Sequence, residues 1–180
     1  MRATLAITVL GAVLLLAGCS SAGEEKATDE AWSTVIKETA HEASSDFERK
    51  VLDDGRITDA EYSELQARVV DCLAGLGLKA GFDPDGSLTY TATRAAPVER
   101  DRIQKCSADN GIRTITLRDA MIRNPSNLDE GTIMVECLRR VGLVDSTYTA
   151  EMYDRGDDLE RISASSLFDS CDADPLHFER

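Results

Sequence analysis

The side chains best suited to chemistry in this sequence are five cysteines, because a thiol can form a disulfide, bind zinc, exchange electrons or accept a lipid. They are spread along the chain as Cys19, Cys72, Cys106, Cys137 and Cys171. No two of them form the C-x-x-C pattern of thiol oxidoreductases or the close pairs typical of structural zinc sites. Disulfides and a lipid attachment are therefore the favoured chemistry, and a tetrathiolate zinc site is kept as an alternative.

Four of these cysteines repeat one spacing. Cys72 and Cys106 are 34 residues apart, and Cys137 and Cys171 are also 34 residues apart. An offset of 65 residues also aligns flanking residues: 70–73 with 135–138, 77–78 with 142–143, and 106–109 with 171–174. This pattern predicts an ancient duplication with one disulfide in each copy, although pairing between the copies would respect the same symmetry. On the chain-entropy model, each disulfide within a copy would increase the free energy of unfolding by ~4 kcal/mol.

Cys19 has a different sequence context. An apolar run over residues 3–17 precedes it, and its 15 residues fall short of the ~20 that a membrane-spanning helix needs. This length, after a single arginine, is typical of a secretory signal. The residues Leu16, Ala17, Gly18 and Cys19 match a bacterial lipobox, which predicts cleavage before the cysteine and its modification by diacylglyceryl and palmitate chains. An ordinary signal peptide or a signal anchor is the alternative.

Charge narrows the range of partners. Removal of residues 1–18, which contain one arginine and no acidic residue, changes the formal charge from −13 to −14. Such a surface repels nucleic acids and anionic head groups. We therefore expect no nucleic-acid partner. The expected location is extracytoplasmic, with lipid on Cys19 anchoring the chain to the cell membrane and an envelope protein as a possible partner.

The domain organisation follows from these features. We predict a signal peptide at 1–18, a flexible spacer at 19–28, one globular domain at 29–176 and a short tail at 177–180. The domain would divide into halves at about 29–110 and 111–176. The predicted fold class is α+β and mainly helical, with two tandem, disulfide-stapled halves, each built as helix–helix–hairpin or loop–short helix.

In the first half, apolar residues recur every three or four positions over about 29–51, which predicts a helix. Thr58 and Glu61 form a capping box that starts a second helix, and Gly77 ends it. Residues 82–88 predict a turn that leads into a strand.

The second half is predicted to begin with a helix near 114–123 that ends at Asn124-Pro125. Ser126 or Asn127 should cap the following helix, which carries Cys137. Thr149 should start a short helix, and a last helical turn should carry Cys171. No hairpin is predicted in this half.

Several of these segments resemble uncharacterised lipoproteins of actinobacteria. They are the stretches at 54–62, 70–73, 124–128, 142–149 and 171–176. The resemblance covers about two-thirds of the mature chain and implies an exported lipoprotein. It implies no activity.

Other motifs are weak. The stretch from Asp54 to Glu61 matches half of an EF-hand loop, but the first two ligand positions would fall on Lys50 and Leu52, which cannot bind calcium. His41 and His177 have no nucleophile motif beside them. We therefore expect no catalytic residues, no metal site and no cofactor.

Three functional hypotheses follow. The first is a non-enzymatic interaction module of the cell envelope. The second is an extracytoplasmic protein that binds a small ligand or a cation, and the third is an envelope hydrolase.

Overall fold

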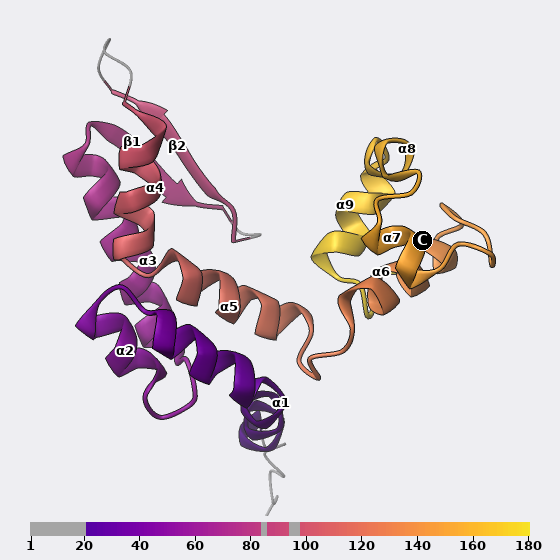
Figure 1. The fold of residues 1–180 in the computed structure, drawn as a ribbon, viewed down its shortest axis with the longest axis horizontal. Coiled ribbons are helices and arrows are strands. Elements are labelled where there is room, and N and C mark those ends of the chain that lie inside the picture. The colour runs from indigo at the N-terminus through magenta and orange to yellow at the C-terminus, as the bar shows by residue number, and fades with distance from the viewer. Residues whose placement is uncertain (1–20, 84–85, 94–97) are drawn as a thin grey trace, which may run out of the picture.

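The structure is a computed structural model that describes residues 21–83, 86–93 and 98–180 (Figure 1). Within these residues the chain is mainly helical and has one two-stranded sheet, which confirms the predicted class. The elements in chain order are α1 (Ser21–Glu42), α2 (Asp46–Leu52), α3 (Asp59–Gly75), β1 (Leu78–Phe82), β2 (Leu88–Ala92), α4 (Arg100–Asp109), α5 (Ile112–Arg123), α6 (Glu130–Arg140), α7 (Ala150–Asp154), α8 (Leu159–Ser163) and α9 (Ser166–Ala173).

The start of the fold differs from the prediction. Helix α1 begins at Ser21, within the segment that we expected to be a flexible spacer. Glu24, Glu25 and Lys26 are residue types with high intrinsic helix propensity.

The predicted helix over 29–51 is divided into α1 and α2. Ser45 caps α2, because its hydroxyl accepts a hydrogen bond from the Glu48 backbone N–H at 3.1 Å. A serine at this position offers the backbone an alternative to continuing the previous helix. The break therefore has a local cause that periodicity alone does not reveal.

Helix α3 and the hairpin follow the prediction. The Thr58 hydroxyl accepts from the Glu61 N–H at 3.3 Å, and the Glu61 carboxylate accepts from the Thr58 N–H at 2.9 Å. Strands β1 and β2 then pair antiparallel, with Leu78 opposite Ala92 and Phe82 opposite Leu88.

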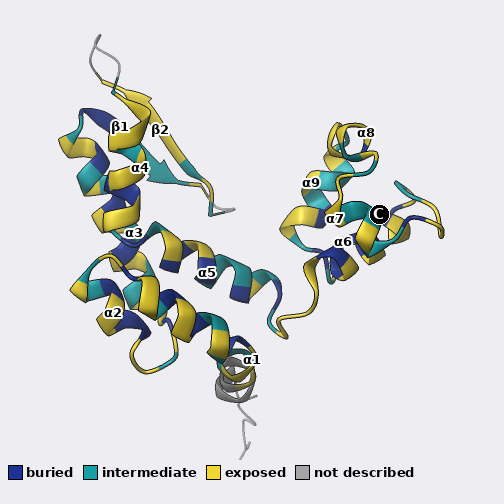
Figure 2. Cartoon of the chain, viewed as in Figure 1, coloured by how far each residue is buried: buried dark blue, intermediate teal, exposed yellow. Residues whose placement is uncertain are grey.

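Helices α1–α5 and the hairpin share one hydrophobic core and form what we call the N-terminal lobe (Figure 2). Ile36 of α1, Leu65 and Leu73 of α3, and Ile115 of α5 are almost fully buried in it. The predicted division into halves placed α5 in the second half, but α5 packs in the core of the N-terminal lobe. Helix α5 contacts α1 and α3 through its apolar stripe. Such a stripe can pack against helices that come before it or after it in the chain.

Helices α6–α9 form the C-terminal lobe around a second core. The buried stripe of α6 runs through Met134, Cys137 and Leu138. Phe178, in the predicted tail, also packs against this core because its aromatic ring gains by burial.

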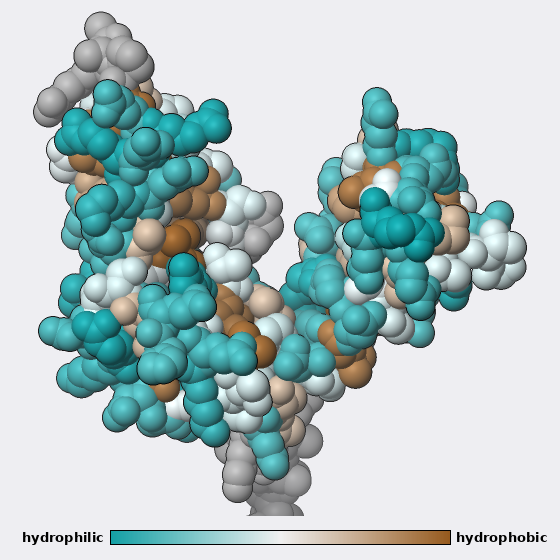
Figure 3. Space-filling view, viewed as in Figure 1, coloured by the Kyte–Doolittle hydropathy of each residue, from teal (hydrophilic) through white to brown (hydrophobic). Residues whose placement is uncertain are grey.

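Residues 124–129, here called the linker, join the two lobes. The N-cap of α6 is Asp129, whose carboxylate accepts from the Thr132 N–H at 2.9 Å; the expected caps Ser126 and Asn127 were therefore wrong. The two lobes lie on either side of an open space, which is also visible between their surfaces (Figures 1 and 3).

Candidate functional site

The cysteines outside the targeting segment form two disulfides, Cys72–Cys106 and Cys137–Cys171. The first joins α3 to α4 and the second joins α6 to α9, so that each lobe contains one. The predicted pairing of Cys72 with Cys106 and of Cys137 with Cys171 is thereby confirmed, and these thiols are not available as zinc ligands. Leu16, Ala17, Gly18 and Cys19, the predicted lipobox, lie outside the described residues.

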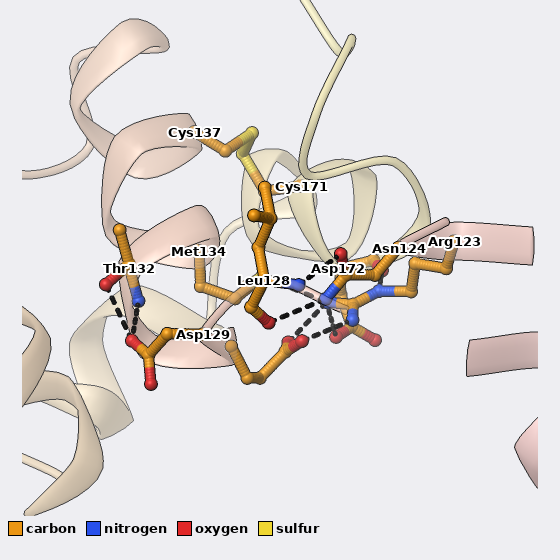
Figure 4. Close-up of polar contacts among 10 residues, drawn as sticks. Arg123, Asn124, Leu128, Asp129, Thr132, Met134, Cys137, Cys171 and Asp172 are labelled. Atoms are coloured by element: carbon orange, nitrogen blue, oxygen red, sulfur yellow. Dashed lines mark hydrogen bonds and ion pairs between the residues drawn. A yellow bond between two sulfur atoms is a disulfide. The ribbon is translucent and has the colours of Figure 1, made fainter. Parts of the chain in front are cut away.

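The second disulfide lies beside a polar junction between the lobes (Figure 4). Arg123, the last residue of α5, donates from its two terminal nitrogens to the two carboxylate oxygens of Glu130, at 2.7 and 2.6 Å. Its Nε donates to the backbone carbonyl of Asp172, next to Cys171. The hydrogen bonds to Glu130 raise the pKa of Arg123 above its ordinary value. Arg123 therefore attaches the N-terminal lobe to both α6 and α9.

Asn124 fixes the linker next to this arginine. Its side-chain nitrogen donates to the Leu128 carbonyl at 2.8 Å, and its side-chain oxygen accepts from the Leu128 N–H at 2.9 Å. The Trp32 indole N–H donates to the Asn124 carbonyl at 2.9 Å, and Asn127 donates to the Ala31 carbonyl at 3.1 Å. The linker is thus held in one conformation against α1.

A cleft of about 650 Å³ opens on the N-terminal lobe next to the linker. Its walls are residues 27–31 of α1, the loop that leads into α3, the end of α5 and the start of the linker. The residues that line it are Ala27, Thr28, Asp29, Ala31, Arg56, Ile57, Thr58, Asp59, Arg118, Met121, Ile122, Pro125 and Ser126. Its volume falls in the range of small-molecule sites.

The cleft combines an apolar floor with charged walls. Ile57 and Met121 are buried beneath it, while Ile122 is 59% exposed at its edge. Arg56 lies 3.9 Å from Asp29 across one wall. This mixture of apolar surface and a few polar groups is the usual composition of a ligand site.

Arg118 is the unusual residue of the cleft. Its Nη2 donates to the carboxylate of Asp59 at 3.2 Å, and the Asp59 side chain is 97% exposed. Its Nε is buried and has no hydrogen-bond partner among the described residues. An unsatisfied buried donor costs about 1–3 kcal/mol.

Two polar pairs, one partly buried and one buried, hold α5 against its neighbours. The Tyr62 hydroxyl donates to Asp119 at 2.6 Å and joins α3 to α5. The Thr114 hydroxyl donates to the Glu48 carboxylate at 2.7 Å and joins α5 to α2. These contacts fix α5, and with it the position of Arg118.

Burial raises the pKa of Tyr62 to about 12, and the hydrogen bond to Asp119 adds to the shift. Burial also raises the pKa of Asp119, against the opposing effects of the Tyr62 hydrogen bond and the Arg118 charge. Arg118 therefore acts on this pair through its positive field.

The polar residues of the weaker sequence motifs lie at the surface. His41 is exposed, and the His177 Nδ1 lies 3.0 Å from the Asp174 carboxylate. Asp54 accepts from the Arg56 N–H at 3.2 Å in the turn before α3. Within the described ranges, no group of three or more His, Cys, Asp or Glu side chains could hold a metal ion.

Arg118, Arg123 and Asn124 were not predicted from the sequence as functional residues. Only the Asn124-Pro125 break marked this stretch, and a break predicts the end of a helix, not the partners of its side chains. Arginine on a helix is common on exposed faces, so its burial at both positions was not visible in the sequence.

None of the helices in the described part of the chain is long and apolar enough to cross a membrane. Comparisons with known protein families, curated protein sequences and solved structures find no match to this chain.

Proposed function

We propose that this protein is an exported lipoprotein, anchored through Cys19, whose folded part is a non-enzymatic interaction module of the cell envelope. The two disulfides support the compartment, because disulfides persist in oxidising, extracytoplasmic surroundings. The match of residues 16–19 to a lipobox supports the anchor.

The observation that carries the interaction role is the junction between the lobes. Arg123 and Asn124 hold two disulfide-stapled lobes in an open arrangement, and the exposed apolar side chains of Ile122 and Leu128 flank these residues. Leu128 is 48% exposed on a protein whose surface is strongly acidic. Apolar side chains that are held rigidly at a junction lose little entropy when a partner covers them.

The experiment is crosslinking of the tagged chain in its own envelope, followed by affinity capture and mass spectrometry. The interaction role predicts one recurrent partner protein that is lost in Leu128→Asp. Tyr90→Asp is the matched control, because Tyr90 is a similarly exposed apolar residue, 46% exposed, on the hairpin. Loss of the partner in both variants, or in neither, would count against the junction as the interaction surface.

The anchor is tested separately. Cys19→Ala should leave the precursor uncleaved at this site and without acyl label, because no thiol remains to accept the lipid. Normal acylation of this variant would refute the lipobox assignment.

We further propose that the two copies of the cysteine spacing arose by duplication. In both copies the helix that carries the first cysteine is followed, five residues after that cysteine, by a glycine with positive φ: Gly77 at 83° and Gly142 at 73°. In both copies the disulfide joins this helix to a later helix. The copies differ in between, where the first has a hairpin and the second has α7 and α8.

A second candidate function, binding of a small ligand, is favoured by one specific observation, the cleft around Arg118.

A further inference from the structure

We infer that the cleft between α1, α3 and α5 binds an organic anion, a carboxylate or phosphate carried on a short apolar body, with Arg118 as the group that pairs with the anion. This inference does not depend on the proposed interaction role, and the anchor at Cys19 bears only on which source supplies the ligand.

The first support is a comparison within one helix. Arg118 and Arg123 lie five residues apart on α5, and each has 21% of its side chain exposed. Arg123 uses all three guanidinium nitrogens in hydrogen bonds to Glu130 and Asp172. Arg118 has one hydrogen-bond partner among the described residues, the Asp59 carboxylate. Equal burial with fewer hydrogen-bond partners leaves donors of the Arg118 guanidinium unused, although its charge also acts on Asp119.

The second support is the nature of that one partner. The Asp59 side chain is 97% exposed, so water screens its charge and its rotamer can change at little cost. It occupies Nη2 of Arg118, while Nε remains without a partner. A carboxylate or phosphate typically binds a guanidinium through two parallel hydrogen bonds. An incoming anion can therefore displace Asp59 and pair with the same guanidinium, after a small movement that opens Nε to the cleft.

The apolar part of the ligand follows from the rest of the cleft. Ile122 is 59% exposed at the edge, and Ile57 and Met121 form a buried apolar floor. A short alkyl or similar group would cover this surface while the anion reaches Arg118. The volume of about 650 Å³ suits a small molecule or the head and first carbons of a lipid.

Two sources share this chemistry. One is a soluble anion, and the other is an anionic lipid head group. The lipid source is plausible in space because Ala27, which lines the cleft, is only eight residues after Cys19. The experiment separates them.

The chain contains one tryptophan, Trp32, which follows Ala31 of the cleft wall and donates to Asn124 beside the cleft. Its fluorescence therefore reports on this site. The full chain, purified in a non-ionic detergent, is titrated with hexanoate and with hexyl phosphate. Hexanol and inorganic phosphate test the apolar part and the anion alone. Water-soluble dihexanoyl phosphatidylglycerol, compared with dihexanoyl phosphatidylcholine, tests the lipid source.

We expect saturable binding of at least one of the amphipathic anions, with at least tenfold weaker affinity in Arg118→Met. Arg113→Met is the matched control on the same helix, since Arg113 pairs with Glu42 on the surface and lies outside the cleft, and its affinity should be unchanged. Arg118→Lys keeps the charge without the guanidinium fork and should bind the same anion several-fold more weakly than the wild-type chain. This variant serves as the test if Arg118→Met does not fold.

Binding of hexanoate or hexyl phosphate that depends on Arg118 supports a soluble ligand. Binding of phosphatidylglycerol alone, with the same dependence, supports a lipid head group. No saturable change with any of these probes, or equal affinity in the unchanged chain and both Arg118 variants, would overturn the inference.

Discussion

At the scale of single residues, the contact between Tyr62 and Asp119 shows how one hydrogen bond connects distant parts of the sequence. These residues are 57 positions apart, and their bond joins α3 to α5 at 2.6 Å. Because burial and the acceptor raise the pKa of Tyr62 to about 12, the phenol keeps its proton in the folded protein at every physiological pH.

This pair predicts a pH effect on stability. The folded protein holds the Tyr62 proton more tightly than the unfolded chain, whose tyrosine has the ordinary pKa of 10.0. The resulting stability is fully present below pH 10 and is lost as the pH rises through about 12. Tyr62→Phe should lower the free energy of unfolding by about 1 kcal/mol near pH 8, and this difference should shrink above pH 10.

Urea unfolding of both proteins at several pH values measures the difference, in which ionisations common to both cancel. Absorbance at 295 nm follows tyrosine ionisation directly, and Tyr62→Phe should lack the transition near pH 12. A difference in unfolding free energy that stays constant across this range would contradict the assignment.

At the scale of elements, the turn between α4 and α5 controls how the N-terminal lobe is packed. Gly111 occupies this turn with φ of 93°, a left-handed conformation that side chains rarely adopt. A Cβ at this position would lie 2.4 Å from Cδ2 of Leu65, which is fully buried in α3. The close approach of α5 to α3 therefore requires glycine.

Gly111→Ala should lower the free energy of unfolding by about 2–4 kcal/mol, because backbone strain adds to overpacking against Leu65. Gly75→Ala is the control. Gly75 lies in α3, has no atom within 4 Å of the added Cβ, and should be neutral or slightly stabilised by alanine. Thermal or urea unfolding of the two variants measures their free energies of unfolding. Similar free energies for Gly111→Ala and Gly75→Ala would show that the contact with Leu65 is unimportant.

At the scale of the whole molecule, two cores with one disulfide each are connected by a linker that is fixed by side-chain hydrogen bonds. Arg123 binds α6 and α9 from the end of α5, and Asn124 closes the linker on itself. The orientation of the lobes therefore depends on a few polar contacts, whereas the integrity of each lobe depends on its own core.

Arg123→Gln should loosen this orientation while both lobes remain folded. The loss of the paired hydrogen bonds to Glu130 should lower the free energy of unfolding by about 1–2 kcal/mol, since Glu130 is half exposed and partly screened. Small-angle X-ray scattering should show a broader distribution of interatomic distances. Arg113→Gln removes a pair at the surface of the N-terminal lobe and should change neither quantity measurably. An unchanged scattering profile in Arg123→Gln would show that the linker alone sets the orientation.

The elements themselves were largely predictable from sequence. The capping box at Thr58, the break at Asn124-Pro125 and the start of α7 after Thr149 all lie where local signals put them. The equal spacing of the cysteines predicted both disulfides. These features depend on contacts within a few residues or on a repeat, and the sequence contains that information directly.

By itself, then, the sequence determined the helical class, several helix boundaries and the pairing of Cys72 with Cys106 and of Cys137 with Cys171, because periodicity, caps and repeats are local or symmetric signals. Only the tertiary structure decided that α5 packs with the first core, and that Arg118 and Arg123 are equally buried but differently paired. The reason is physical. An amphipathic helix can bury its apolar face against many partners, and the partner that it finds decides which hydrogen bonds its charged side chains can make.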